Sequence, residues 1–225
     1  MNLFKALSYK EWIKTRKVIG VLFTATIAVL AYSFIEVTHS IRLDEAVNEW
    51  YAFLFMDKSL PLITMILPLI SGLALALVQF VPEMVNKRLK LTLHLPADET
   101  SIISSMLMYG YLVLVLMFAL TIIVYVCGMS FIFPYEATYM MIARLTPSFV
   151  SGLAVYGFTA WVCFEPQWKQ RVLNLLIAVG LISVLFVSQQ SGVYLHFGLG
   201  LIVIFIASFA FPFFSVLRFN MVFSN

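Results

Sequence analysis

Long apolar stretches dominate the hydrophobic pattern of this chain. A helix rises about 1.5 Å per residue, so crossing the roughly 30 Å hydrocarbon core of a bilayer takes about 20 apolar residues. Stretches that are apolar on all sides predict transmembrane helices, whereas the strands of a transmembrane β-barrel would alternate between apolar and polar residues. The predicted spans are about 18–34, 60–81, 102–127, 141–164, 172–187 and 197–216.

Composition supports an all-α integral membrane protein. Of the 225 residues, 62% are hydrophobic and 11% are charged, whereas soluble domains carry about 25% charged residues. The spans leave little room for a separate soluble domain, so we expect residues 1–225 to form a single transmembrane domain. Cys127 and Cys163 then face opposite leaflets, which excludes a disulfide between them.

The distribution of basic residues orients the six helices. Cytoplasmic loops of membrane proteins are enriched in Lys and Arg. With the N-terminus inside, eleven basic residues lie on the cytoplasmic side and three outside, and the reverse topology inverts this ratio. We therefore expect both the N- and the C-terminus to be cytoplasmic. The inner set is Lys5, Lys10, Lys14, Arg16, Lys17, Lys87, Arg88, Lys90, Lys169, Arg171 and Arg218, and the outer set is Arg42, Lys58 and Arg144.

The segment before the first span predicts an amphipathic interfacial helix over residues 1–17. Such a helix lies in the headgroup layer, with apolar residues on one face and basic residues on the other. The apolar face would carry Leu3, Leu7, Trp12 and Ile13, with Trp12 as the anchor; the basic residues are Lys5, Lys10, Lys14, Arg16 and Lys17. The alternative is a basic flank that only sets topology.

The connection after the first span, residues 36–59, is long and acidic. Ala46, Trp50, Leu54 and Phe55 recur at helical spacing, which favours a short helix on the outer leaflet. Such a helix serves either as a structural cap or as a gate. Glu36 and Arg144 form either an ion pair lining an outer vestibule or two separate solvated charges.

The inner segment after the second span is the most informative part of the sequence. Pro82 predicts the end of that span. The residues that follow, 83–95, are too few to cross a membrane and too apolar for a plain linker, which is typical of a surface that binds a protein partner. The alternative is a topology-setting loop on the lipid surface.

Three features together resemble the permease subunits of ABC-2 type ABC transporters. One is the basic entry sequence Lys10-Glu11-Trp12-Ile13-Lys14-Thr15-Arg16-Lys17, which is similar to the amphipathic connecting helix of that family. Another is the six-helix layout. The third is the segment in which Glu83, Arg88, Leu91, Leu93, Leu95 and Pro96 stand at the family's positions. Family members often have Gly-Thr where this chain has Leu89-Lys90, so the motif is divergent.

The resemblance implies a subunit that does not hydrolyse ATP itself. The chain lacks a G-x-x-x-x-G-K-[ST] loop, so ATP and Mg would be bound by a separate ABC-type ATPase, and no cofactor is expected in this chain. A short coupling helix between spans 2 and 3 would contact that ATPase, with polar contacts from Lys87, Arg88 and Lys90 and packing contacts from Leu91, Leu93 and Leu95.

Further expectations follow from the resemblance and from the residues. A second permease copy would complete the pathway, membrane lipids would surround it in a bacterial inner membrane, and the cargo, most often exported in the family, would be lipid-like, a peptide or another amphipathic compound. Nucleic-acid binding is not expected, because the basic residues are spread over several segments. Gly72 and Ala76 allow close helix approach, either at the dimer seam or within one subunit.

Two other classes of function remain as alternatives. An intramembrane enzyme could use Ser191 and His196, but their spacing does not place a nucleophile beside a base. We therefore expect no catalytic residues. His39, His94 and His196 fall on different sides of the membrane, so no metal site is expected. A membrane assembly or anchoring subunit without transport activity is the other alternative.

Overall fold

The computed structural model is all-helical over the residues that it describes, which are 3–44, 48, 51–52, 61–85, 99–187 and 197–223. Six helices in this part of the chain are long and apolar enough to cross a membrane, which confirms the helical class and the predicted number of spans. The main elements are α1 (Leu3–Asp44), α3 (Leu62–Val85), α5 (Glu99–Met129), α6 (Tyr135–Phe164), α7 (Trp168–Ser183) with the short 3-10 helix η1 (Val184–Phe186), and α9 (Gly198–Phe223).

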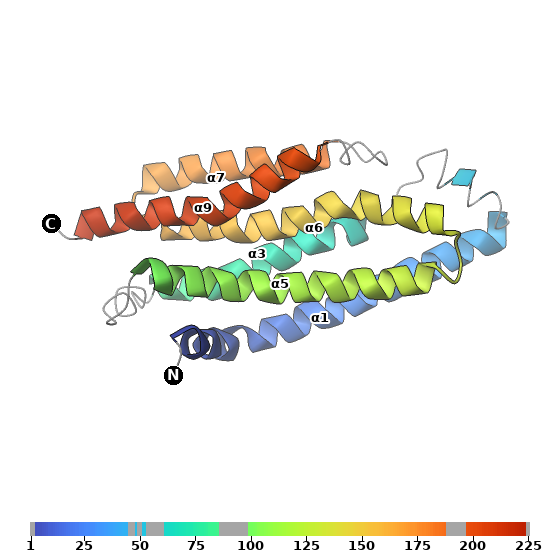
Figure 1. The fold of residues 1–225 in the computed structure, drawn as a ribbon, viewed down its shortest axis with the longest axis horizontal. Coiled ribbons are helices and arrows are strands. Elements are labelled where there is room, and N and C mark those ends of the chain that lie inside the picture. Colours follow the sequence, from blue (N-terminus) through green and yellow to red (C-terminus); the bar gives the residue numbers. More distant parts are fainter. Residues whose placement is uncertain are drawn as a thin grey trace.

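The helices lie side by side as a bundle, and successive helices run in opposite directions (Figure 1). Both chain ends lie at the same end of this bundle (Figure 1). We call this end the terminal end and the other the far end. The start of α5 and the end of α3 also lie at the terminal end, so residues 86–98 join two helices there. An even number of spans requires this arrangement of the termini, which the sequence predicted.

Helix α6 forms the centre of the bundle and contacts α3, α5, α7 and α9. Glycine permits the closest of these approaches. A Cβ atom on Gly72 of α3 would lie 1.9 Å from the carbonyl oxygen of Gly152 on α6, and one on Gly157 would lie 2.2 Å from the carbonyl oxygen of Ser208 on α9. Gly72 and Ala76 are both buried within this chain. Their small side chains therefore serve helix packing inside one subunit.

Two predicted boundaries are wrong. Helix α3 does not end at Pro82 but continues to Val85, so that Pro82 lies inside the helix. Proline is tolerated in helices of membrane proteins because neighbouring groups satisfy the freed backbone carbonyl. Helix α1 likewise continues past the expected start of the outer connection at residue 36, as far as Asp44. The proposed short helix with Ala46, Trp50, Leu54 and Phe55 lies outside the described residues.

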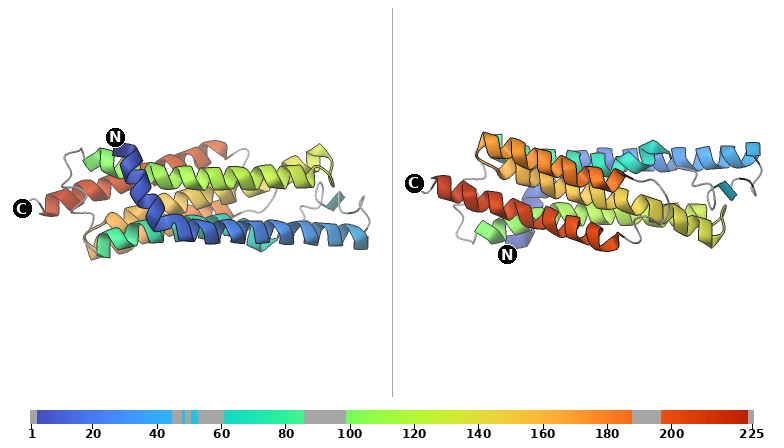
Figure 2. Two further views of the ribbon diagram at one scale, coloured as in Figure 1. Left: turned by 90° about the horizontal axis from the view of Figure 1, so that it is seen from below. Right: turned by 90° about the horizontal axis from the view of Figure 1, so that it is seen from above.

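The predicted interfacial segment is the beginning of α1 and is continuous with the first span. The first turns run at an angle to the rest of the helix (Figure 2). The Thr15 hydroxyl donates a 2.9 Å hydrogen bond to the Glu11 carbonyl oxygen one turn earlier, and such bonds bend helices. At 42 residues, α1 is about 63 Å long, roughly twice the thickness of a hydrocarbon core.

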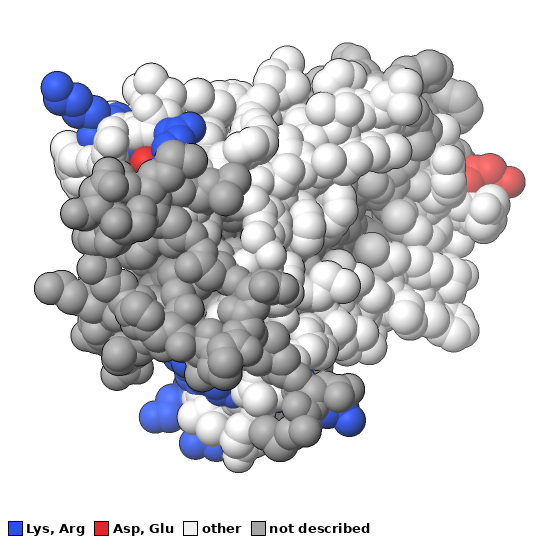
Figure 3. Space-filling model, turned by 60° about the vertical axis from the view of Figure 1, so that its left-hand side comes forward, with Lys and Arg blue, Asp and Glu red and all other residues white. Residues whose placement is uncertain are grey.

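Charged side chains lie toward the two ends of the bundle. On the face shown in Figure 3, Lys and Arg lie toward one end with an acidic group beside them, another acidic group stands at the opposite end, and uncharged residues lie between. Large apolar side chains are exposed in the middle parts of several helices, among them Val21, Ile27, Leu116, Leu176 and Ile206. Water would penalise such a surface, whereas lipid hydrocarbon would not.

Candidate functional site

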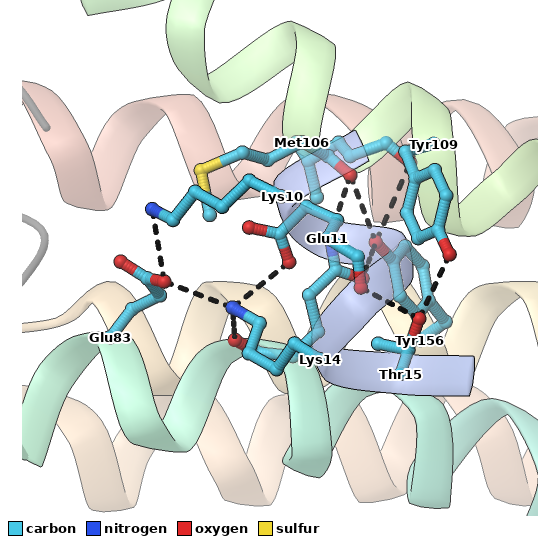
Figure 4. A network of polar contacts seen from close by, with 10 residues as sticks. Lys10, Glu11, Lys14, Thr15, Glu83, Met106, Tyr109 and Tyr156 are labelled. Carbon is cyan, nitrogen blue, oxygen red and sulfur yellow. Dashed lines mark hydrogen bonds and ion pairs between the residues drawn. The ribbon is translucent and has the colours of Figure 1, made fainter. Parts of the chain in front are cut away.

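A buried ionic network lies at the terminal end, where α1 meets α3. Glu83 is close to the end of α3, and its carboxylate is 1% exposed. The Lys14 Nζ lies 2.9 Å from Glu83 Oε1, and the Lys10 Nζ lies 3.2 Å from the same oxygen. Lys14 also lies 2.9 Å from Oε2 of Glu11 and donates a 2.8 Å hydrogen bond to the Gln79 carbonyl oxygen. The first turns of α1 are therefore held to the last turns of α3 (Figure 4).

Neutral hydrogen bonds extend this network to α5 and α6. The Gln79 amide nitrogen donates to the Met106 carbonyl oxygen at 2.9 Å, and the Tyr156 hydroxyl donates to the Gln79 side-chain oxygen at 2.8 Å. The hydroxyls of Thr15 and Tyr109 share a 2.8 Å hydrogen bond. Side chains or backbone from four helices thus meet at one place (Figure 4).

The network pairs two ammonium groups with two carboxyl groups. Lys14 lies 2.9 Å from both Glu11 and Glu83, and Lys10 lies 3.2 Å from Glu83. A buried charge without a partner is costly, so each group depends on its partner. Buried ion pairs add little net stability compared with apolar packing, but removing one partner is strongly destabilising. The arrangement therefore fixes the position of α1 relative to α3 more than it adds to overall stability.

A second cluster, centred on Glu165, joins α6 to α7 and α9 at the same end. Glu165 follows α6 directly, and its side chain is fully buried. Its Oε2 accepts a 2.7 Å hydrogen bond from the Ser215 hydroxyl and lies 3.5 Å from Nη1 of Arg218, both on α9. Its carbonyl oxygen accepts a 2.6 Å hydrogen bond from Nη2 of Arg171 on α7. One residue thus links α6, α7 and α9.

The predicted interfacial residues divide into two groups. Trp12 is about half exposed, and Arg16 and Lys17 are exposed, as an interfacial helix requires. Lys14, which was expected on the outward basic face, turns toward α3, and the inward face consists of Leu7, Glu11 and Thr15. The predicted division into an apolar and a basic face is therefore wrong, because Leu7 is buried whereas Trp12 and Ile13 are exposed. Lys14 lies seven residues after Leu7 and thus on the same inward face, where it meets the Glu83 carboxylate.

The predicted coupling segment is described only in part. Glu83 belongs to α3 and bonds within the chain, so any role in coupling would be indirect. The other residues of the segment, Lys87, Arg88, Lys90, Leu91, Leu93 and Leu95, lie outside the described residues, as do Ser191 and His196.

The proposed pair at the far end does not form. Glu36 is exposed on α1, Arg144 is buried on α6, and the ion pairs between described residues do not join them. Arg144 is not a separate solvated charge either, because its side chain is buried. It instead lies among the buried residues of α6.

Sequence reasoning missed most members of the two clusters. Gln79 carried a usable signal, because a polar amide within an apolar run is a functional or structural candidate. Glu11 and Lys14 carried another, because residues three apart share a helical face. Tyr109, Tyr156 and Glu165 carried none, since their partners are distant in sequence.

These observations define the class of protein. Six apolar helices, an apolar middle surface and charge confined to the ends identify a multi-pass helical membrane protein. Within the described residues, no three His, Cys, Asp or Glu side chains lie close enough to hold a metal ion. No family model, curated protein or solved structure matches the chain.

Proposed function

We propose that this chain is the permease subunit of an ABC-type transporter, similar to the ABC-2 type, and that it works with a separate cytoplasmic ATPase. Two copies of the chain, or this chain and a similar one, would form the pathway in a bacterial inner membrane. Members of that family most often export their substrates, so the transport would be outward. The cargo would be a lipid-like, peptide or other amphipathic compound.

The observation that carries the proposal is the buried network around Glu83. Residues 86–98 begin three positions after Glu83 and carry the basic and Leu-rich sequence of the coupling segment. An ATPase that bound and displaced this segment would pull on the last turn of α3. The Glu83 carboxylate, bonded to Lys10 and Lys14, would pass that displacement to the bent start of α1.

The same displacement would reach the remaining helices. Gln79 lies one turn before Glu83 and bonds to the backbone of α5 and to Tyr156 on α6. Helix α6 contacts α9 through Gly157, and Glu165 joins α6 to α7 and α9. A motion that starts at residues 86–98 would therefore have polar and close-packed contacts to each of these helices through which to act.

The basic residues agree with a cytoplasmic terminal end. The described residues Lys5, Lys10, Lys14, Arg16, Lys17, Lys169, Arg171 and Arg218 lie near helix ends at the terminal end. Positive charge favours the cytoplasmic side, where an ATPase would have access to residues 86–98.

Co-purification tests this function directly. The tagged protein is extracted from its native membrane with a mild detergent, and the proteins that accompany it are identified. We expect a chain with a P-loop ATP-binding motif in stoichiometric amount. Recovery of the protein alone, after crosslinking through lysine residues before extraction, would contradict the proposal and favour an anchoring subunit or an intramembrane enzyme.

A further inference from the structure

A lateral groove runs between α1 and α5. It has a volume of ≈ 360 Å³ and is lined almost entirely by apolar atoms, from residues between Phe23 and Phe34 on α1 and between Met117 and Val124 on α5. Phe23, Ile27, Leu120 and Val124 are large apolar side chains of this lining that are exposed. The groove is therefore part of the surface that faces hydrocarbon in a membrane.

The groove adjoins a cavity in the interior of the bundle. Thr26, Leu30 and Thr121 line both the groove and an inner cavity, which is bounded in addition by α3 and α6. The inner cavity extends to Pro68 and Phe149 and has a free volume of ≈ 20 Å³. This is room for a single small group, such as the terminal methyl of a chain whose remainder lies in the groove.

Hydroxyl groups line the inner cavity, but their protons are already donated. The Thr26 hydroxyl donates to the Leu22 carbonyl oxygen and the Thr121 hydroxyl to the Met117 carbonyl oxygen, each at 2.8 Å. The Ser71 hydroxyl likewise donates to the Leu67 carbonyl oxygen at 2.8 Å, and the hydroxyls of Thr64 and Ser33 share a 2.8 Å hydrogen bond. Because none of these hydroxyl groups has a proton left to donate, the cavity offers no donor to the phosphate or carbonyl oxygens of a headgroup and suits the end of a hydrocarbon chain.

The dimensions fit one chain of one leaflet. Along α1 the groove extends from Phe23 to Phe34. This length is about 17 Å at a rise of 1.5 Å per residue. Half of a hydrocarbon core is about 15 Å thick. On α5 the lining residues belong to the half of the helix nearer the far end. The groove therefore matches the length and direction of a lipid tail in the leaflet at the far end.

We propose that this groove and the inner cavity form a binding site for one acyl chain of a membrane lipid. The chain would lie along α1 between Phe23 and Phe34, with its methyl end beside Thr26 and Thr121. The occupant is a lipid tail because the groove is continuous with the hydrocarbon-facing surface. In addition, Thr26 and Thr121, where the groove adjoins the inner cavity, present no free hydrogen-bond donor. The site does not depend on transport activity and would exist in an anchoring subunit as well.

Photolabelling tests the site. The protein is reconstituted in phosphatidylcholine vesicles that contain a small fraction of phosphatidylcholine with a diazirine at the end of one acyl chain, and the labelled peptides are mapped after illumination. We expect labels to concentrate around the proposed position of the chain end, on Thr26, Leu30 and Thr121 and the residues next to them. Ala31, an exposed residue of the groove lining, provides the blocking variant, and Ala28, an exposed residue outside the lining, provides the matched control.

The substitution Ala31→Trp should reduce this labelling severalfold because the indole ring occupies the groove, whereas Ala28→Trp should not change it. Thr26→Val keeps the shape of the side chain between the groove and the inner cavity but removes its hydroxyl, and it should also leave labelling unchanged. Labelling spread evenly around the bundle, or unaffected by Ala31→Trp, would overturn the proposal. Crosslinks between two copies through α1 would overturn it too, because a second subunit would then fill the groove.

Discussion

Neutralising Glu83 tests whether the ionic network fixes α1 against α3. The Glu83→Gln substitution keeps the shape of the side chain but removes the charge that two lysine residues share. Removing one partner of a fully buried pair costs about 3–5 kcal/mol. The expected loss here is smaller, because Lys10 is 39% exposed and Lys14 keeps its 2.9 Å contact with Glu11. We expect a loss of about 2 kcal/mol in the free energy of unfolding, which lies between the 3–5 kcal/mol of a fully buried pair and the 0–1 kcal/mol of exposed pairs.

The assay is thermal unfolding of the purified protein in detergent, followed by circular dichroism at a fixed scan rate. A change of 1 kcal/mol shifts Tm by about 2–4 °C in chains of 150–250 residues. Glu83→Gln should therefore lower Tm by roughly 4–8 °C. Lys17→Gln is the matched control, since Lys17 is an exposed charge on the same part of α1, and its effect should stay within about 0.5 kcal/mol.

A double-mutant cycle isolates the pair itself. If Lys14 and Glu83 interact directly, Lys14→Met and Glu83→Gln together should cost less than the sum of the single losses, with a coupling energy of about 0.5–3 kcal/mol. Additive losses, or a loss for Glu83→Gln no greater than that for Lys17→Gln, would refute the reasoning.

Two further predictions concern packing and topology. Gly72→Ala places a Cβ 1.9 Å from a backbone oxygen of α6 and should lower the free energy of unfolding by at least about 1–3 kcal/mol in the same thermal assay. Gly180→Ala is the control, because its Cβ meets no atom within 4 Å and should not lower Tm. Equal Tm values for the two variants would contradict the close approach of α3 and α6. A membrane-impermeant label at Lys169 should react only from the cytoplasmic side, and labelling from outside would contradict the six-span topology.

The length of the apolar runs was sufficient to predict the number of apolar helices, because each predicted span falls mainly within a separate helix. The ends of the helices were harder to predict, because local signals competed with tertiary contacts. Pro82 is a helix breaker by itself, yet the helix continues past it, and the next residue bonds to two lysine side chains of α1.

In the candidate site too, the sequence identified some residues but not their contacts. The sequence identified Lys10, Lys14 and Glu83 as residues of interest, but it could not show that they contact one another, since α1 and α3 meet only in the folded bundle. A helical wheel of residues 1–17 places Lys14 beside Leu7, seven residues earlier, so the periodicity itself puts Lys14 on the buried face of Leu7 and Glu11. The sequence could not show that the carboxylate of Glu83 lies opposite this face. Likewise, the spacing of Gly72 and Ala76 predicted close packing without showing that α6 is the partner.

Crosslinking from the segment after α3 tests the central claim most directly. A photo-crosslinker is introduced at Lys87, within the predicted coupling segment, and as a control at Phe131, which is 90% exposed at the far end. After illumination of native membranes, the proposed function predicts an adduct between position 87 and a chain with a P-loop ATP-binding motif, and none from position 131. No such adduct from position 87, or equal adducts from both positions, would contradict an ATPase-coupled permease.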